Sequence, residues 1–146
     1  MSELSVTEMS HDDVDAVVEL WARAGNTRSW NDPGEDIAFA MRSPNSTVLV
    51  GREGDRIVAT AMVGHDGHRG AVYYVAVDPG HRRAGHGAEV MTAAENWLRG
   101  KGIWKLNLLV RAGNLDAVRF YESLGFEEQP RIYMEKWLDE RRRSPR

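Results

Sequence analysis

Short stretches of alternating or uninterrupted hydrophobic residues, typical of β-strands, recur along the chain. The stretch at 71–77 is apolar at nearly every position, which is typical of a strand covered on both faces. Glu53-Gly54-Asp55 separates two β-rich stretches and favours a hairpin, and Asp66-Gly67 indicates a second tight turn with positive φ. The predicted strands are 4–9, 47–52, 56–65, 71–77, 105–110 and 132–137.

Elsewhere hydrophobic residues recur every three or four positions, the spacing of amphipathic helices. Ser10 followed by Asp13 is a capping pattern, and Asp32-Pro33 combines a capping residue with a proline suited to a first turn. Gly25 and Gly125 are suited to ending helices. The predicted helices run from Ser10 to near Gly25, from Asp32 through Met41, from Gly85 to Arg99 and from Leu115 to Leu124.

The order of these elements predicts the fold class. A strand–helix–strand unit over 71–110 places two parallel strands side by side through a right-handed crossover, and an antiparallel meander precedes it. We therefore expect an α/β (α+β) domain with a mixed sheet of six or seven strands and about four helices. The 146 residues suit one domain, expected over 1–138, with a basic, frayed tail at 139–146.

Composition excludes several classes of protein. With 42% hydrophobic and 28% charged residues the chain is an ordinary globular protein, and without cysteine it has neither disulfides nor a thiol nucleophile. No apolar run approaches the length of a membrane span, and the first 15 residues carry five acids and neither Lys nor Arg. We therefore expect a cytoplasmic protein without a secretory signal or a membrane partner.

The net charge of −3 is unevenly distributed, because the last eight residues hold four arginines and two acids. The remainder is more acidic, which disfavours nucleic acid as a partner and favours a cationic substrate. Assembly stays open, with a homodimer among the options.

A glycine-containing turn after the apolar 71–77 strand is the most informative segment. It reads Val77-Asp78-Pro79-Gly80-His81-Arg82-Arg83-Ala84-Gly85-His86-Gly87-Ala88. Free backbone amides at the start of the following helix favour an anion, and Arg82, Arg83 and His86 add donors. A P-loop would need Lys and Ser/Thr where His86-Gly87 stand, and a dinucleotide fingerprint would need glycine at Val90. The remaining alternative is a helix start whose glycines only allow tight packing.

A second motif, Asn114-Leu115-Asp116-Ala117-Val118-Arg119-Phe120-Tyr121-Glu122-Ser123-Leu124-Gly125-Phe126, follows the next predicted strand. Together with Arg82-x-x-Gly85-x-Gly87 it closely resembles the GNAT superfamily of acetyl-CoA-dependent N-acetyltransferases. The predicted element order over residues 4–137 fits that family's fold. Trp30-Asn31-Asp32-Pro33 and Asp66-Gly67-His68-Arg69-Gly70 resemble the small bacterial YpeA-type members.

The resemblance implies a cofactor site without a metal. The backbone of Val75-Ala76-Val77 would lie alongside the pantetheine arm of acetyl-CoA, where this strand separates from the parallel strand predicted at 105–110. Amides from Arg83 to Ala88 would hold the pyrophosphate, and Asn114 would bond the arm or brace the strand separation. Tyr121 occupies the position of the family's general acid, the alternative being a core tyrosine. The implied cofactor-binding residues are Val75, Ala76, Val77, Arg82, Arg83, Ala84, Gly85, His86, Gly87, Ala88 and Asn114.

Transfer to an amine also needs a base, because a lysine-like amine of pKa ~10.4 is only about one part in 2,500 neutral at pH 7. Family members that acetylate ribosomal-protein N-termini carry a glutamate where this chain has Leu109. The base therefore stays unassigned, with Tyr73 or Tyr74 acting through water as the first hypothesis and His65 as the second. N-terminal acetylation of a ribosomal protein is correspondingly disfavoured.

The acceptor pocket is expected near Trp30, Asp32 and Tyr73, because this fold builds acceptor contacts from the polar loop between its first helices. Packing of Trp30 on the core is the alternative. A metal held by His65 and His68 is disfavoured, since the two lie on a tight turn without a convincing third ligand. The predicted function is acetyl transfer from acetyl-CoA to a primary amine of a small molecule, peptide or protein. The competing hypothesis is a non-catalytic acyl-CoA sensor.

Overall fold

Five strands form one mixed sheet in the computed structural model, which describes residues 4–82 and 84–143. They lie in chain order, antiparallel from the first to the fourth, and the fifth runs parallel to the fourth. The strands are β1 (Ser5–Glu8), β2 (Ser46–Glu53), β3 (Arg56–His65), β4 (Gly70–Val77) and β5 (Leu106–Asn107). The α/β class and the antiparallel meander are confirmed.

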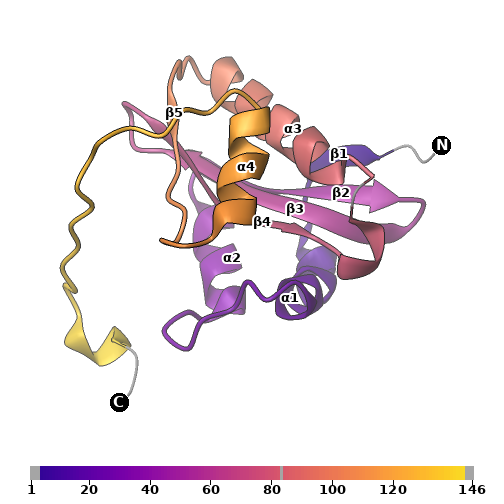
Figure 1. The fold of residues 1–146 in the computed structure, drawn as a ribbon. Helices are drawn as coiled ribbons and strands as arrows, with labels where there is room; N and C mark the ends of the chain where they lie inside the picture. The colour runs from indigo at the N-terminus through magenta and orange to yellow at the C-terminus, as the bar shows by residue number, and fades with distance from the viewer. Residues whose placement is uncertain (1–3, 83, 144–146) are drawn as a thin grey trace. The chain divides into compact units, whose positions relative to one another are not determined.

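The helices begin and end close to the predicted positions: α1 (Val14–Arg23), α2 (Pro33–Arg42), α3 (His86–Gly100) and α4 (Leu115–Ser123). Ser10 and Asp13 form a capping box before α1, and Asp32 accepts a hydrogen bond from the Glu35 amide at the start of α2. α3 covers one face of the sheet, and α1 and α2 cover the other (Figure 1).

The core fills the space on both faces of the sheet. Fully buried Leu20 and Trp21 of α1 pack with Val48 and Val50 of β2 on one face. On the other face α3 buries its apolar residues, and it approaches β4 so closely that a Cβ on Gly70 would lie 2.5 Å from Leu98 Cδ1. The buried residues of α3 are His86, Val90, Met91, Ala94 and Leu98.

The chain divides into two compact units, residues 1–108 and 109–146, and each is described by itself. The second unit contains α4, a long irregular segment and a short 3-10 turn at Glu140–Arg142. A domain boundary at residue 138 stays a prediction, and residues 144–146 of the expected frayed tail lie outside the described chain.

The expected strands at the end of the chain need correction. Residues 132–137 form no strand, and only Leu106–Asn107 of the 105–110 stretch pairs in the sheet. The sheet of the described chain thus has five strands rather than six or seven. Alternation identifies an extended backbone, but a strand also requires a ladder partner, which residues 132–137 lack here. Ile132 and Met134 are 90% and 85% exposed.

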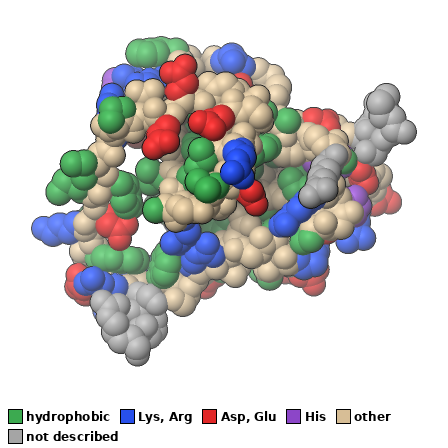
Figure 2. All heavy atoms as spheres, viewed as in Figure 1, with side chains coloured by type: hydrophobic (Ala, Val, Ile, Leu, Met, Phe, Trp, Pro, Cys, Tyr) green, Lys and Arg blue, Asp and Glu red, His purple; other side chains and the backbone are tan. Residues whose placement is uncertain are grey.

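The surface carries both signs of charge. Acidic and basic side chains are interspersed with apolar ones on the face drawn in Figure 2. In the part of the chain that the structure describes, the helices are too short or too polar to span a bilayer.

Candidate active site

β4 and β5 pair over only two positions, Gly70 with Leu106 and Ala71 with Asn107. Among the described residues, the β5-facing edge of β4 has no further ladder partner from Val72 to Val77. This is the separated parallel pair that was expected. An open strand edge offers backbone donors and acceptors to an extended ligand.

A bulge in β4 lies at the start of this open edge. Tyr74 has a φ of +52°, which is rare for an aromatic residue, and the register with β3 shifts between Thr60 and Met62. The buried Thr60 hydroxyl donates to the Tyr74 carbonyl at 2.9 Å and accepts from Trp21 Nε1 at 2.8 Å. The Asn26 side-chain amide donates to the Val75 carbonyl at 3.2 Å. Side chains from β3, α1 and the following loop therefore fix the shape of β4.

The turn after β4 leads directly into α3. Asp78 accepts from the Gly80 amide at 3.0 Å, and Gly85 is the N-cap of α3 with a φ of +83°. Glycine has no side chain to cap the first amides of α3, whereas Asp32 and Asn114 cap α2 and α4. The uncapped amides and the helix dipole together favour an anion at this helix end.

The side chains predicted around this turn lie in different environments. Arg82 is exposed, and Arg83 lies outside the described residues. The imidazole of His86 is buried, and its Nε2 lies 2.8 Å from Glu53 Oε2. The imidazole therefore contacts another side chain inside the protein, and only the backbone amide of His86 remains a candidate donor to a ligand.

The loop between α1 and α2 meets β4 at Tyr74. The Tyr74 hydroxyl donates to Asp36 Oδ2 at 2.7 Å, Asn31 also bonds it, and Asp32 lies near enough to act on it electrostatically. Burial, and then the Asp36 carboxylate, hold the pKa of Tyr74 well above its usual range, so the phenol stays protonated. Tyr74 is therefore the tyrosine of β4 that contacts this region. Of the residues predicted to line the acceptor pocket, Tyr73 is 59% exposed and Trp30 is 37% exposed.

The second unit holds the other two predicted residues. Asn114 Oδ1 accepts from the Ala117 amide at 3.2 Å, so this oxygen caps α4 and the side-chain NH₂ remains as the donor. Tyr121 packs edge-on against Phe120 and Phe126, with ring centroids 5.0 and 5.6 Å away. Burial raises the pKa of Tyr121, which keeps its hydroxyl protonated at neutral pH.

His65 and His68, considered above as metal ligands, make their contacts within the turn between β3 and β4. His65 Nδ1 accepts from the Gly67 amide at 3.0 Å, and Arg69 Nη1 lies 3.3 Å from His68 Nδ1. Over residues 4–82 and 84–143, no group of three or more His, Asp or Glu side chains could hold a metal ion. His65 is also engaged in the turn through Nδ1, which weakens the second hypothesis for the base.

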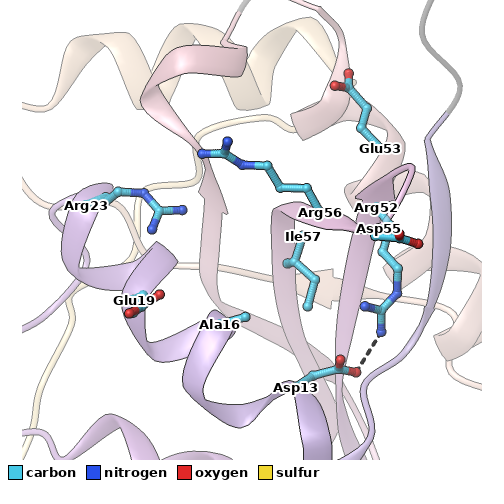
Figure 3. Close-up of a pocket in the computed structure, with 9 residues that line it drawn as sticks. All are labelled: Asp13, Ala16, Glu19, Arg23, Arg52, Glu53, Asp55, Arg56 and Ile57. Atoms are coloured by element: carbon cyan, nitrogen blue, oxygen red, sulfur yellow. Dashed lines mark hydrogen bonds and ion pairs between the residues drawn. The ribbon is translucent and has the colours of Figure 1, made fainter.

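A polar groove of about 580 Å³ lies between α1 and the β2–β3 hairpin (Figure 3). The guanidinium groups of Arg23 and Arg56 point toward one another and both bind Asp78 Oδ2, at 3.0 and 3.1 Å. Arg52 pairs with Asp13 at 2.7 Å. None of the predicted site residues lines this groove.

Sequence reasoning missed several residues that shape the site. Asp36 lies one turn after Asp32 in α2, and a second acid there was a usable signal for a cationic ligand. Thr60, Asn26 and Glu53 gave no such signal, because their partners are distant in sequence and only the fold brings them together.

A parallel pair that separates after two positions and an uncapped turn between β4 and α3 are the arrangement that the resemblance implied. The sequence model described as the acetyltransferase (GNAT) family matches residues 14–126. An acetyltransferase of Sodalis glossinidius is 34% identical over 131 residues, which span 90% of this chain and 92% of the relative. The chain belongs to the GNAT family of acetyltransferases, and acetyl-CoA is its cosubstrate.

Solved structures show the same fold. The ribosomal-protein-S18-alanine N-acetyltransferase of Escherichia coli matches with a TM-score of 0.75 and 24% identity, covering 87% of this chain and 79% of that one. An aminoglycoside N-acetyltransferase solved in complex with CoA matches with a TM-score of 0.82 and 15% identity, covering 95% and 97%. At these identities the likeness concerns the fold alone.

Proposed function

We propose that this protein transfers the acetyl group of acetyl-CoA directly to a primary amine of a small molecule, peptide or protein. One observation carries the proposal: a single turn, residues 78–85, joins the open edge of β4 to the uncapped first turn of α3. An extended arm and a pyrophosphate are the two parts of coenzyme A that such an edge and turn would bind.

Cofactor binding is assigned to backbone more than to side chains. The open edge of Val75–Val77 would hydrogen-bond the pantetheine arm, and amides from Ala84 to Ala88 would hold the pyrophosphate. Arg82 and Arg83 would add charge beside the phosphates. Asn114 would contribute its side-chain NH₂, since its oxygen already caps α4.

Tyr121 is proposed as the general acid. The amine nitrogen forms a bond to the thioester carbonyl carbon, the carbon–sulfur bond breaks, and the leaving sulfur takes the phenolic proton. The phenol is protonated before the reaction, since burial holds the pKa of Tyr121 above its usual value. A thiol of pKa roughly 8.5 is a tolerable leaving group, so the acid contributes moderately.

The acceptor is proposed to lie beside α2 and β4, near Trp30, Asp32 and Tyr73. Asp32 and Asp36 together give this region a negative charge that attracts an ammonium group. The Tyr74–Asp36 hydrogen bond supports Tyr74 over Tyr73 as the proton relay. The phenol oxygen would accept the amine proton while its own proton passes to the carboxylate. Because Leu109 replaces the glutamate base, ribosomal N-termini are not proposed as acceptors.

A thiol-release assay with a panel of amines tests the proposal. The panel pairs each primary amine with its N-acetylated or tertiary analogue, and calorimetry measures acetyl-CoA binding separately. The expected result is CoA release that depends on a primary amine. Acetyl-CoA binding without release across the panel would instead support the acyl-CoA sensor.

A further inference from the structure

Five titratable side chains from three parts of the fold meet beside the turn that joins β4 to α3. Glu53, at the end of β2, lies between two histidines: its Oε2 is 2.8 Å from His86 Nε2 and its Oε1 is 3.5 Å from His81 Nε2. Asp78 and Glu89 flank the cluster. Figure 3 shows Glu53 at the rim of the groove, with its carboxylate turned away from Asp13 and Ala16.

Each imidazole faces a second carboxylate through its other nitrogen. His86 Nδ1 lies 3.6 Å from Glu89 Oε1, and His81 Nδ1 lies 3.9 Å from Asp78 Oδ1. Both Nδ1 atoms are buried and make no hydrogen bond within the described chain. The two histidines therefore depend on Glu53 for their close polar contact, and the ion pairs of Asp78 with Arg23 and Arg56 continue the network to α1 and β3.

Glu53 contacts the turn at two separate positions. His81 lies in the middle of the segment between β4 and α3, and His86 is the first residue of α3, directly after Gly85. Glu53 comes from the hairpin, more than twenty residues earlier in the chain. A single carboxylate thus ties the middle and the end of the turn to the rigid part of the sheet.

The contact between His86 and Glu53 lies in the protein interior. The His86 side chain is fully buried, although a buried imidazole is costly unless its polar atoms are paired. An apolar side chain would fill this position without such a cost. The histidine is explained if its contact with Glu53 fixes the first turn of α3, where the amides proposed to hold the pyrophosphate lie.

We propose that Glu53 is a positioning residue for acetyl-CoA binding, acting through His86 and His81 to hold the described residues of the turn, 79–82 and 84–88, in their binding conformation. This inference rests on the proposed function, because that function assigns the pyrophosphate to the turn. In this proposal Glu53 acts through the turn and not by contact with the cofactor or the acceptor.

Glu53→Ala, Glu53→Gln and a matched control, Asp55→Asn in the same hairpin, test the inference. Glu53→Ala is expected to weaken acetyl-CoA binding about tenfold by calorimetry and to raise its KM equally, with kcat within about twofold. Glu53→Gln keeps one acceptor oxygen for His86 and should recover about half of the loss on a logarithmic scale. Asp55→Asn should bind as the wild type does.

Two further measurements separate this inference from the proposed function. Hydrogen exchange of the free protein should be faster in segment 79–88 of Glu53→Ala and unchanged in α2, whether or not the protein acetylates amines. In a His86→Leu background, Glu53→Ala should have a clearly smaller effect on binding, since the two residues act together. Unchanged exchange in 79–88 would overturn the inference. A folded Glu53→Ala or Glu53→Gln variant with normal KM and lowered kcat would do so as well.

Discussion

The indole of Trp21 lies flat on the ring of Tyr74, with centroids 3.7 Å apart and planes 9° from parallel. The same indole donates to Thr60, whose hydroxyl donates in turn to the Tyr74 carbonyl. Tyr74 has a positive φ, which costs about 1–3 kcal/mol at a non-glycine residue and persists only where its surroundings determine it. The stack and the threonine together determine the bulge in β4.

Thr60→Val should destabilise the protein by about 1–3 kcal/mol, because it leaves the Trp21 N–H and the Tyr74 carbonyl without their partner. Urea unfolding measures this loss. Thr7→Val, on the exposed side of β1, is the matched control and should change stability by less than about 0.5 kcal/mol. A Thr60→Val protein as stable as that control would show that the bulge does not depend on the hydroxyl.

Asp78→Asn should lower stability in a pH-dependent way. Burial of Asp78 raises its pKa, but the Gly80 amide and the guanidinium groups of Arg23 and Arg56 outweigh burial and hold the pKa below 3.8. Folding therefore favours the charged carboxylate. Its contribution is complete above about pH 5 and is lost as the pH falls through the lowered value.

The difference in unfolding free energy between wild type and Asp78→Asn should thus be about 1–3 kcal/mol near pH 6 and shrink below about pH 3.8. Urea titrations at several pH values measure it. A difference that stays constant into acid would show that the carboxylate's charge contributes nothing.

Gly85→Val should weaken acetyl-CoA binding about tenfold or more. Gly85 has a φ of +83°, where a β-branched residue is strained, and its side chain would stand beside the amides proposed to hold the pyrophosphate. Calorimetry measures the affinity, and Gly102→Val, also at positive φ but at the other end of α3, is the control. Equal losses in both variants would attribute the effect to strain alone.

Trp30→Ala should raise KM for the amine several-fold and leave acetyl-CoA affinity unchanged, because Trp30 is assigned to the acceptor side. Steady-state kinetics with each substrate varied in turn separates the two. Phe39→Ala, at an exposed position of α2, serves as control. Loss of cofactor affinity with a normal amine KM would refute the acceptor assignment.

Sequence patterns predicted most of the fold but less of the site. Capping residues and helical spacing located α1, α2 and α4 within a few residues, because these signals are local. The prediction of a strand at 132–137 was wrong, because strand pairing depends on a partner that alternation of polar and apolar residues cannot identify. The glycine turn was recognisable because Gly85 and the basic residues are adjacent. The buried contact of His86 was not recognisable, because its partner Glu53 is distant in sequence and only the fold brings the two together.

The most direct measurement is single-turnover transfer by wild type and Tyr121→Phe, with saturating acetyl-CoA and an amine from the panel. The phenylalanine keeps the ring that packs on Phe120 and Phe126, so folding and cofactor affinity should survive. We expect one acetylated amine per CoA released by wild type and a rate about 10²-fold lower for Tyr121→Phe. Equal rates with chemistry limiting would contradict the role of Tyr121. Cofactor binding by wild type without any acetylated amine would contradict the proposed function.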